Sequence, residues 1–284
     1  MVNGTEASGG STEREGPPTA SVADPLRLVT RANRRLKLAI VAATGVVVIL
    51  SVMTSVSFWD AVGIPIFYVL LPGLALAQLP LLRIGRVERL PIYVGSAATI
   101  LVVGGLALWL LFRLEGGRPE SLAPIPARDL ALWTALLTVV GIVLLGSLTV
   151  LDRGVMGGEP STLLELLPRS PRERWAFAGL SVCAGFGEEI AYRGYALSVV
   201  QLLGIGPWAA AAVSAAAFGV LHSYQGGLGT ARTAVTGLVL TVPVLMAGTI
   251  LPAILAHVLV DLAGGLVIGP WLLRSALVRT EARE

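Results

Sequence analysis

Charged residues are scarce in this sequence. Asp, Glu, Lys and Arg together make up 14% of the 284 residues, whereas hydrophobic residues make up 55%. Soluble domains carry about 25% charged residues. The composition therefore excludes an ordinary soluble domain and indicates a membrane protein with several spans, for which one compact bundle is the simplest organisation.

Cysteine, lysine and histidine are scarcer still. The one cysteine, Cys183, excludes an intramolecular disulfide and a cysteine-based zinc site. Lys37 is the only lysine, and the other basic residues are arginines that gather at the ends of apolar segments. We interpret these arginines as charges that orient the chain in a lipid bilayer, and we expect no nucleic-acid partner. The two histidines are His222 and His257.

Apolar segments long enough to cross a membrane recur along the chain. A helical crossing needs about 20 mostly apolar residues, because the hydrocarbon core is about 30 Å thick. A helix satisfies its backbone polar groups internally, so we predict an all-α fold, a polytopic bundle of about eight transmembrane helices. The eight segments are 37–58, 63–82, 91–112, 130–150, 175–201, 207–223, 233–249 and 252–273.

The polar ends of the chain and the arginines predict its organisation. Residues 1–30 are predicted to be a disordered cytoplasmic tail, because residues 1–25 are rich in Gly, Ser, Thr, Glu and Pro. Residues 31–273 form the bundle, with a motif-bearing core at 160–273, and 274–284 form a short cytoplasmic tail. Alternate connections carry the arginines, so we predict a multi-pass protein of the cell (inner or plasma) membrane with both termini in the cytoplasm. These arginines include Arg31, Arg34, Arg86, Arg89, Arg153, Arg172, Arg232 and Arg279.

The first motif places three ionisable residues inside an apolar segment. Glu189 and Arg193 stand at i and i+4, so they are expected to pair on one helix face. Glu188 lies about 100° around the helix and shares its face with Tyr192. Glu189 is then a structural partner of Arg193, whereas Glu188 is free to act as a general base or a metal ligand.

The other two motifs contain the histidines. His222 shares a face with Phe218, and His257 shares a face with Asp261, which can orient the imidazole or accept its N–H. If Glu188 converges with both histidines, water can be activated between them, and the result is a hydrolytic site. The same three side chains are candidate ligands for zinc or another divalent metal.

Each motif also has a structural explanation. A Glu–Arg pair can simply join two helices, and a single membrane histidine is more often a satisfied hydrogen-bonding residue than a ligand. Charge inside a membrane span is costly, however, so the three motifs together favour a functional site over a structural network. Two candidates are weaker. Cys183 is best interpreted as a packing residue, and the G-x-S pattern at Ser181, which could suggest a serine protease, is close to chance.

A non-catalytic membrane protein remains the alternative. A partner-binding immunity protein or a proton-linked transporter could use the same buried polar groups. A transporter is expected to show broken helices in two related halves, whereas these polar groups lie only in the C-terminal half. That asymmetry favours the hydrolase.

The three motifs, in this order, resemble the signature of the CPBP intramembrane protease family. This family includes the CAAX prenyl proteases and bacteriocin-processing or immunity proteins, and is also called the Abi family. The resemblance covers roughly residues 160–273. It rests on Glu188-Glu189-Ile190-Ala191-Tyr192-Arg193, Phe218-Gly219-Val220-Leu221-His222, Tyr224-Gln225-Gly226, Gly248-Thr249-Ile250-Leu251-Pro252 and His257-Val258-Leu259-Val260-Asp261.

The resemblance implies an all-helical membrane endopeptidase that acts on a membrane-associated peptide or protein. It implies that Glu188 and His222 activate water, and that His257 and Asp261 stabilise the oxyanion. Many relatives have Asn in place of Asp261, and an ionised Asp fits metal ligation or orientation of His257 better. The family is often labelled metalloprotease, yet a glutamate-driven mechanism without metal is equally compatible. The Arg- and Ala-rich composition suggests a GC-rich bacterium, which argues against a prenylated target.

Overall fold

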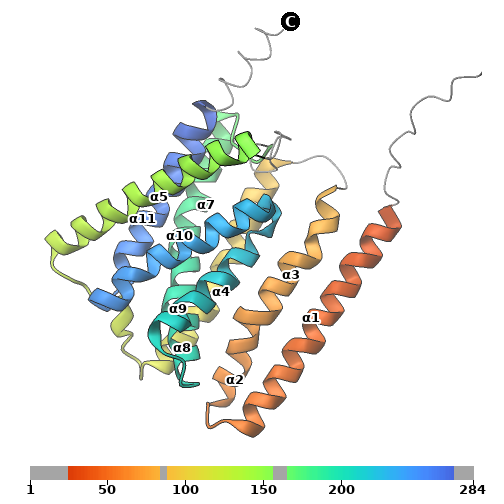
Figure 1. Ribbon diagram of the computed structural model, residues 1–284, viewed down its shortest axis with the longest axis vertical. Helices are drawn as coiled ribbons and strands as arrows, with labels where there is room; N and C mark the ends of the chain where they lie inside the picture. Colours follow the sequence, from red (N-terminus) through yellow and green to blue (C-terminus); the bar gives the residue numbers. More distant parts are fainter. Residues whose placement is uncertain (1–24, 84–87, 156–164, 272–284) are drawn as a thin grey trace, which may run out of the picture.

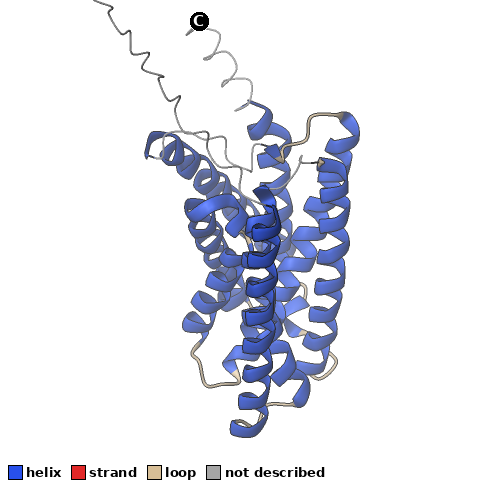
Figure 2. Ribbon diagram, turned by 90° about the vertical axis from the view of Figure 1, so that its right-hand side faces the viewer, coloured by secondary structure: helices blue, strands red, loops and turns tan. Residues whose placement is uncertain are grey.

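A computed structural model describes residues 25–83, 88–155 and 165–271 of the chain. Within these ranges every regular element is a helix, and no strand is present (Figure 2). The predicted all-α fold is therefore confirmed. The predicted tails at 1–24 and 274–284 lie outside the described residues.

The elements follow one another as rods that run up and down the bundle (Figure 1). The N-terminal half consists of α1 (Pro25–Met53), α2 (Phe58–Pro65), the π-helix η1 (Ile66–Leu70), α3 (Leu71–Gln78), the 3-10 helix η2 (Leu79–Arg83), α4 (Arg89–Leu114), the 3-10 helix η3 (Glu120–Leu122) and α5 (Ala127–Val155). The C-terminal half consists of α7 (Pro171–Glu189), the π-helix η4 (Ile190–Ala196), α8 (Leu197–Gln201), α9 (Pro207–Leu221), the 3-10 helix η5 (Ser223–Gln225), α10 (Gly226–Ala247), α11 (Leu251–Leu262) and the π-helix η6 (Ala263–Ile268).

Six described helices are long and apolar enough to cross a membrane. The two other predicted crossings are α9, which is shorter, and the continuous α7–η4–α8 rod, whose hydropathy is lowered by Glu188, Glu189 and Arg193. The 15 residues of α9 rise only about 22 Å, less than the ~30 Å hydrocarbon core.

Helix α1 begins earlier than predicted. Residues 25–30 were expected to belong to the tail, but α1 starts at Pro25. Leu28 and Ala32 are buried, and the Arg35 guanidinium donates a hydrogen bond of 2.9 Å to the Leu76 carbonyl at the end of α3. These contacts give the arginine-bearing turns of α1 a packing partner, so the helix extends beyond its apolar segment.

Helix α7 lies between α4 and α11, and glycine allows its close approach to α4. A Cβ on Gly104 of α4 would lie 2.7 Å from the Gly187 Cα atom, and one on Gly187 would lie 2.9 Å from the Ile100 carbonyl oxygen. A side chain at either glycine would separate the two helices. The close approach fixes the segment of α7 that immediately precedes Glu188.

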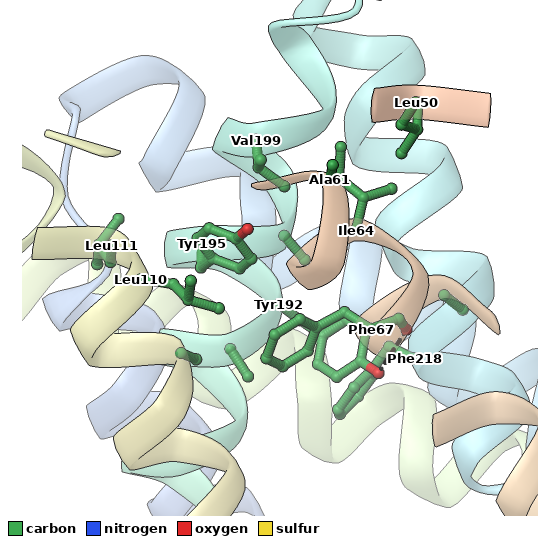
Figure 3. Close-up of a cluster of buried hydrophobic side chains, with 14 residues drawn as sticks. Leu50, Ala61, Ile64, Phe67, Leu110, Leu111, Tyr192, Tyr195, Val199 and Phe218 are labelled. Atoms are coloured by element: carbon green, nitrogen blue, oxygen red, sulfur yellow. Dashed lines mark hydrogen bonds between the residues drawn. The ribbon is translucent and has the colours of Figure 1, made fainter. Parts of the chain in front are cut away.

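The main hydrophobic cluster surrounds the π-helix η4 (Figure 3). Tyr192 and Tyr195 of η4 pack edge-on against Phe67 of η1, with ring centroids 6.0 and 5.5 Å apart. The Tyr192 hydroxyl donates to the Phe67 carbonyl at 3.1 Å, and the Tyr68 hydroxyl donates to the Ala196 carbonyl at 2.8 Å. The N-terminal half thus holds the wide turn that follows the two glutamates.

Asp60 falls between the first two predicted spans, and in the structure it belongs to a helix. Ser57 caps α2, so Asp60 falls in the first turn of this helix and is buried. Its carboxylate accepts hydrogen bonds from Ser57 Oγ at 2.6 Å and from the Tyr195 hydroxyl at 3.1 Å. Asp60 therefore helps to hold η4 instead of facing solvent.

Candidate active site

The first motif lies where α7 changes into the π-helix η4. A capping box fixes the start of α7: Ser170 accepts from the Glu173 backbone N–H, and the Glu173 carboxylate accepts from the Ser170 N–H. Glu188 and Glu189 are the last residues of α7, and Arg193 lies in η4. A π-helical turn is wider than an α-helical one, and such turns are frequent at functional sites.

Glu189 and Arg193 form the predicted ion pair. Arg193 Nη1 donates to Glu189 Oε1 at 3.0 Å, and both side chains are fully buried. The guanidinium also stacks over the Phe218 ring, 4.2 Å from its centroid. Gly237 of α10 makes room for it, because a Cβ there would lie 2.7 Å from Arg193 Nη2.

His257 of α11 joins both glutamates. Its Nδ1 lies 2.7 Å from Glu189 Oε1, and an ionised carboxylate can only accept, so Nδ1 carries a proton and donates it. The other ring nitrogen, Nε2, lies 3.8 Å from Glu188 Oε2 and 3.7 Å from Asp261 Oδ2. Glu189, not Asp261, therefore makes the hydrogen bond that orients His257, and the sequence reasoning missed this contact.

His222 approaches the same site from the end of α9. Its Nδ1 donates to the Phe218 carbonyl at 3.0 Å, because a carbonyl only accepts. The Phe218 ring packs against both imidazoles, with centroids 4.7 Å from His222 and 6.4 Å from His257. Among the described residues no hydrogen bond or ion pair joins His222 directly to Glu188.

Glu189 Oε2 and Arg193 Nη2 are buried without a hydrogen-bond partner among the described residues, and the same holds for one oxygen of Glu188, its Oε2 atom. The side chains of Glu188 and His257 are 17% and 12% exposed, whereas Asp261 is 37% exposed. The site is therefore nearly closed around Glu188 and opens on the side of Asp261.

Tyr192 does not face the site as its spacing from Glu188 indicated. It lies in η4, where the α-helical i, i+4 register no longer holds, and its hydroxyl is bound to the Phe67 carbonyl. Tyr192 therefore supports the site from the hydrophobic cluster.

The described side chains do not form a metal centre in their present positions. In the ranges that the structure describes, no group of three or more His, Cys, Asp or Glu residues has an arrangement that could hold a metal ion. Glu188 and Asp261 both flank His257 Nε2, but His222 hydrogen-bonds to Phe218 and is not joined to them. The proposed ligand set of Glu188, His222 and His257 therefore does not fit a metal without rearrangement.

Arg232 was assigned to the end of a span, and the structure places it elsewhere. Helix α10 begins at Gly226, so Arg232 lies two turns inside it. Its Nη2 donates to Gln225 Oε1 at 2.6 Å, and Gln225 Nε2 donates to the Tyr224 hydroxyl at 3.2 Å. The sequence signal that could have drawn attention to Arg232 is a charged residue within an otherwise apolar stretch.

The fold and the site define a polytopic membrane protein with a buried glutamate–histidine centre. The family model for Rce1-like proteins, described as type II CAAX prenyl endopeptidase Rce1-like, matches residues 170–263, about one third of the chain. The match begins at the cap of α7 and includes all three motifs, and it confirms the resemblance indicated by their residues. Comparisons with curated proteins and with solved structures gave no match.

Proposed function

We propose that this protein is an intramembrane endopeptidase that hydrolyses peptide bonds of membrane-associated or lipid-anchored substrates. The match to a CAAX prenyl endopeptidase family supports the reaction class. The observation that carries the proposal is the buried, unpartnered Glu188 oxygen beside an imidazole that Glu189 already orients. An unsatisfied carboxylate oxygen in a nearly closed site is a suitable acceptor for the proton of a water molecule.

In the proposed mechanism, Glu188 removes a proton from water, and the resulting hydroxide attacks the carbonyl carbon of the scissile peptide bond. His222 assists because its Nδ1–H is committed to the Phe218 carbonyl, which leaves Nε2 as an acceptor that can position the water. The C–N bond then breaks, and Glu188 passes its proton to the departing amine. The products are a carboxylic acid and an amine.

His257 and Asp261 act on the other side of the reacting carbonyl in this proposal. With Nδ1–H bound to Glu189, His257 in its doubly protonated form directs Nε2–H toward the developing oxyanion. Asp261, if ionised, can only accept hydrogen bonds. Its proposed contribution is to balance the charge of the doubly protonated His257 from 3.7 Å away, at the open side of the site.

The test is cleavage of a membrane-associated peptide by the purified protein. Glu188→Gln is expected to lower the cleavage rate about 10²–10⁴-fold, as for loss of a general base, with the thermal unfolding temperature unchanged. Glu120→Gln is the matched control, because Glu120 is an exposed carboxylate in η3 that belongs to none of the motifs. Equal activity of wild-type and Glu188→Gln protein would remove Glu188 from the mechanism.

Metal assistance is tested in the same assay. The candidate metal ligands are Glu188, His222 and His257, and the proposed mechanism assigns every step to side chains of the protein itself. Cleavage is measured before and after chelation, with the metal content of the protein determined in parallel. Full activity in metal-free protein is the expected result, whereas loss of activity that zinc restores would establish a metalloprotease.

The alternative functions predict a different outcome. A partner-binding immunity protein or a proton-linked transporter would cleave no peptide, although it would fold and insert normally. Proton movement in sealed vesicles that depends on Glu188 would support the transporter.

We also propose that the protein lies in the cell membrane with both termini in the cytoplasm. The first turn of α1 and the η6 end of the α11 rod lie at the same end of the bundle (Figure 1). The Arg89 guanidinium, bound to the Glu165 carbonyl at 2.7 Å, and Arg35 support an arginine-rich inner end. Single cysteines at residue 30 and at the C-terminus, in a protein lacking Cys183, should react only from the cytoplasmic side.

A further inference from the structure

Gly237 lies near the middle of α10, at a place where the fold leaves no room for a side chain. A Cβ atom there would lie 2.7 Å from Arg193 Nη2, 3.3 Å from the Phe218 Cδ1 atom and 3.7 Å from the Ala215 Cα atom. The φ angle of Gly237 is not positive, so the missing side chain, and not the backbone freedom of glycine, matters here. The α10 backbone therefore touches two side chains of the candidate site directly.

The guanidinium of Arg193 is held by contacts on several sides. Nη1 donates to Glu189 Oε1 at 3.0 Å, and the group stacks over the Phe218 ring at 4.2 Å. Nη2 is buried and has no hydrogen-bond partner among the described residues. Because no hydrogen bond holds Nη2, its packing against Gly237 determines how far the guanidinium extends toward α10.

One carboxylate oxygen connects Arg193 to the imidazole of His257. Glu189 Oε1 accepts from Arg193 Nη1 at 3.0 Å and from His257 Nδ1 at 2.7 Å. Both bonds are charge-assisted, and such bonds are short and directional. A guanidinium that changes its position therefore moves the oxygen to which the imidazole is bound.

The Phe218 ring offers a second route from α10 to the histidines. The ring that would meet a Cβ at Gly237 also packs against both imidazoles, with centroids 4.7 Å from His222 and 6.4 Å from His257. The contacts through Arg193 and through Phe218 thus lead to the same imidazole, that of His257.

We propose that Gly237 is a positioning residue of the endopeptidase site, because its missing side chain places the Arg193 guanidinium and the Phe218 ring and, through them, the imidazole of His257. The inference rests on the proposed endopeptidase function. It adds α10, which carries none of the three motifs, to the elements that determine the geometry of the reaction. Gly237 itself touches no reacting atom.

The first test compares two alanine substitutions in the same helix. Gly237→Ala and Gly227→Ala gain the same helix propensity, but nothing lies within 4 Å of a Cβ at Gly227. The guanidinium is the far end of a long side chain, so it should yield to the new methyl group while α10 stays in place. We expect kcat for cleavage of a membrane-associated peptide to fall about 10- to 100-fold in Gly237→Ala, with KM unchanged, and to stay at the wild-type value in Gly227→Ala.

The second test needs no cleavage. His222 and His257 are the only histidines of the chain, so protein labelled with ¹⁵N in its histidine rings shows two imidazoles, and His222→Gln assigns them. The Nδ1–H proton of His257 reports its hydrogen bond to Glu189. In Gly237→Ala this proton resonance should move upfield and exchange faster with water, whereas in Gly227→Ala it should stay unchanged.

The third test asks whether the methyl group acts through Arg193. Lysine keeps the positive charge but has no Nη2 atom. The double variant Gly237→Ala with Arg193→Lys should therefore have nearly the same kcat as Arg193→Lys alone. If Gly237→Ala does not fold, the double variant decides in its place: restored folding supports the contact with Nη2, and failure of both variants to fold contradicts it.

An unchanged His257 resonance in Gly237→Ala would overturn the inference, and so would an equal loss of kcat with arginine or lysine at position 193. Absence of cleavage by the wild-type protein, together with a shifted resonance in Gly237→Ala, would contradict the proposed function and leave the positioning contact in place. The two failures are therefore distinguishable.

Discussion

The two halves of the molecule hold their polar groups in different ways. Among the described residues of α1–α5, Asp60 is the one buried charged side chain, and its carboxylate accepts hydrogen bonds from Ser57 and Tyr195. In α7–α11 the ionisable groups of the three motifs gather around His257 and the Phe218 ring. The first half supplies packing contacts, and the second holds the residues of the candidate site.

The comparison shows that the site needs both halves although its ionisable residues come from one. The family match covers 170–263 only. Nevertheless, the π-helix η4 is held by hydroxyl contacts with Asp60, Phe67 and Tyr68 from the N-terminal half. If this division is correct, substitutions in the two halves should change activity and stability in different proportions.

The largest effect is expected for Glu189→Gln in the second half. Removing one partner of a buried ion pair costs about 3–5 kcal/mol, because Arg193 is left as an unpaired buried charge. The substitution also weakens the bond that orients His257, so we expect both thermal stability and kcat to fall. Unfolding in detergent and peptide cleavage measure the two losses.

A double substitution separates the two roles of Glu189. Glu189→Gln combined with Arg193→Gln leaves no buried charge unpaired, so part of the stability should return while activity stays low. Recovery of full activity in the double variant would show that Glu189 is only a structural partner of Arg193, as its spacing alone suggested.

The second-largest effect is expected at the contact between α4 of the first half and α7 of the second, where Gly104 meets Gly187. Gly104→Leu should force α4 away from α7, because a Cβ there would lie 2.7 Å from the Gly187 Cα atom. Overpacking of this kind costs typically about 1–3 kcal/mol. Gly105→Leu is the matched control, because nothing lies within 4 Å of a Cβ at that position. Equal thermal unfolding temperatures for the two variants would contradict the close α4–α7 contact.

A smaller effect is expected for the hydroxyl contacts of the first half. Tyr195→Phe removes one hydrogen bond to Asp60, worth about 0.5–1.5 kcal/mol, and leaves the ring packed on Phe67. Stability should fall slightly and kcat should stay within a few-fold of the wild type. A loss of activity as large as that of Glu188→Gln would mean that the first half participates in the chemistry directly.

The sequence predicted the bundle and the identity of the clustered residues well, for a physical reason. Apolar length determines which segments cross a membrane, and charge within them is rare enough to be conspicuous. The i, i+4 spacing correctly predicted the Glu189–Arg193 pair and the shared face of Phe218 and His222.

Contacts between distant helices could not be predicted from spacing. The bond from His257 to Glu189 joins residues 68 positions apart, and local periodicity carries no information about it. The π-helix η4 changed the register that was expected for Tyr192. Helices α1 and α10 also begin earlier than the predicted spans. In the bundle Leu28 of α1 is buried and Arg232 of α10 hydrogen-bonds to Gln225, and the sequence shows neither contact.

The smallest effect is expected at the start of the second half, outside the apolar core. Hydrogen bonds from the Arg169 and Ser170 backbone N–H groups hold the pKa of the Glu173 carboxyl below its usual range. A lowered pKa in the folded state means that Glu173 stabilises the protein above the ordinary carboxyl pKa, and that this contribution is lost as the pH falls through the lowered value. Glu173→Gln should therefore lower the unfolding temperature slightly at pH 7, whereas Arg172→Gln, at the exposed neighbouring position, should not. The difference between Glu173→Gln and wild type should shrink in acid, and a difference that is constant with pH would show that the cap acts by geometry alone.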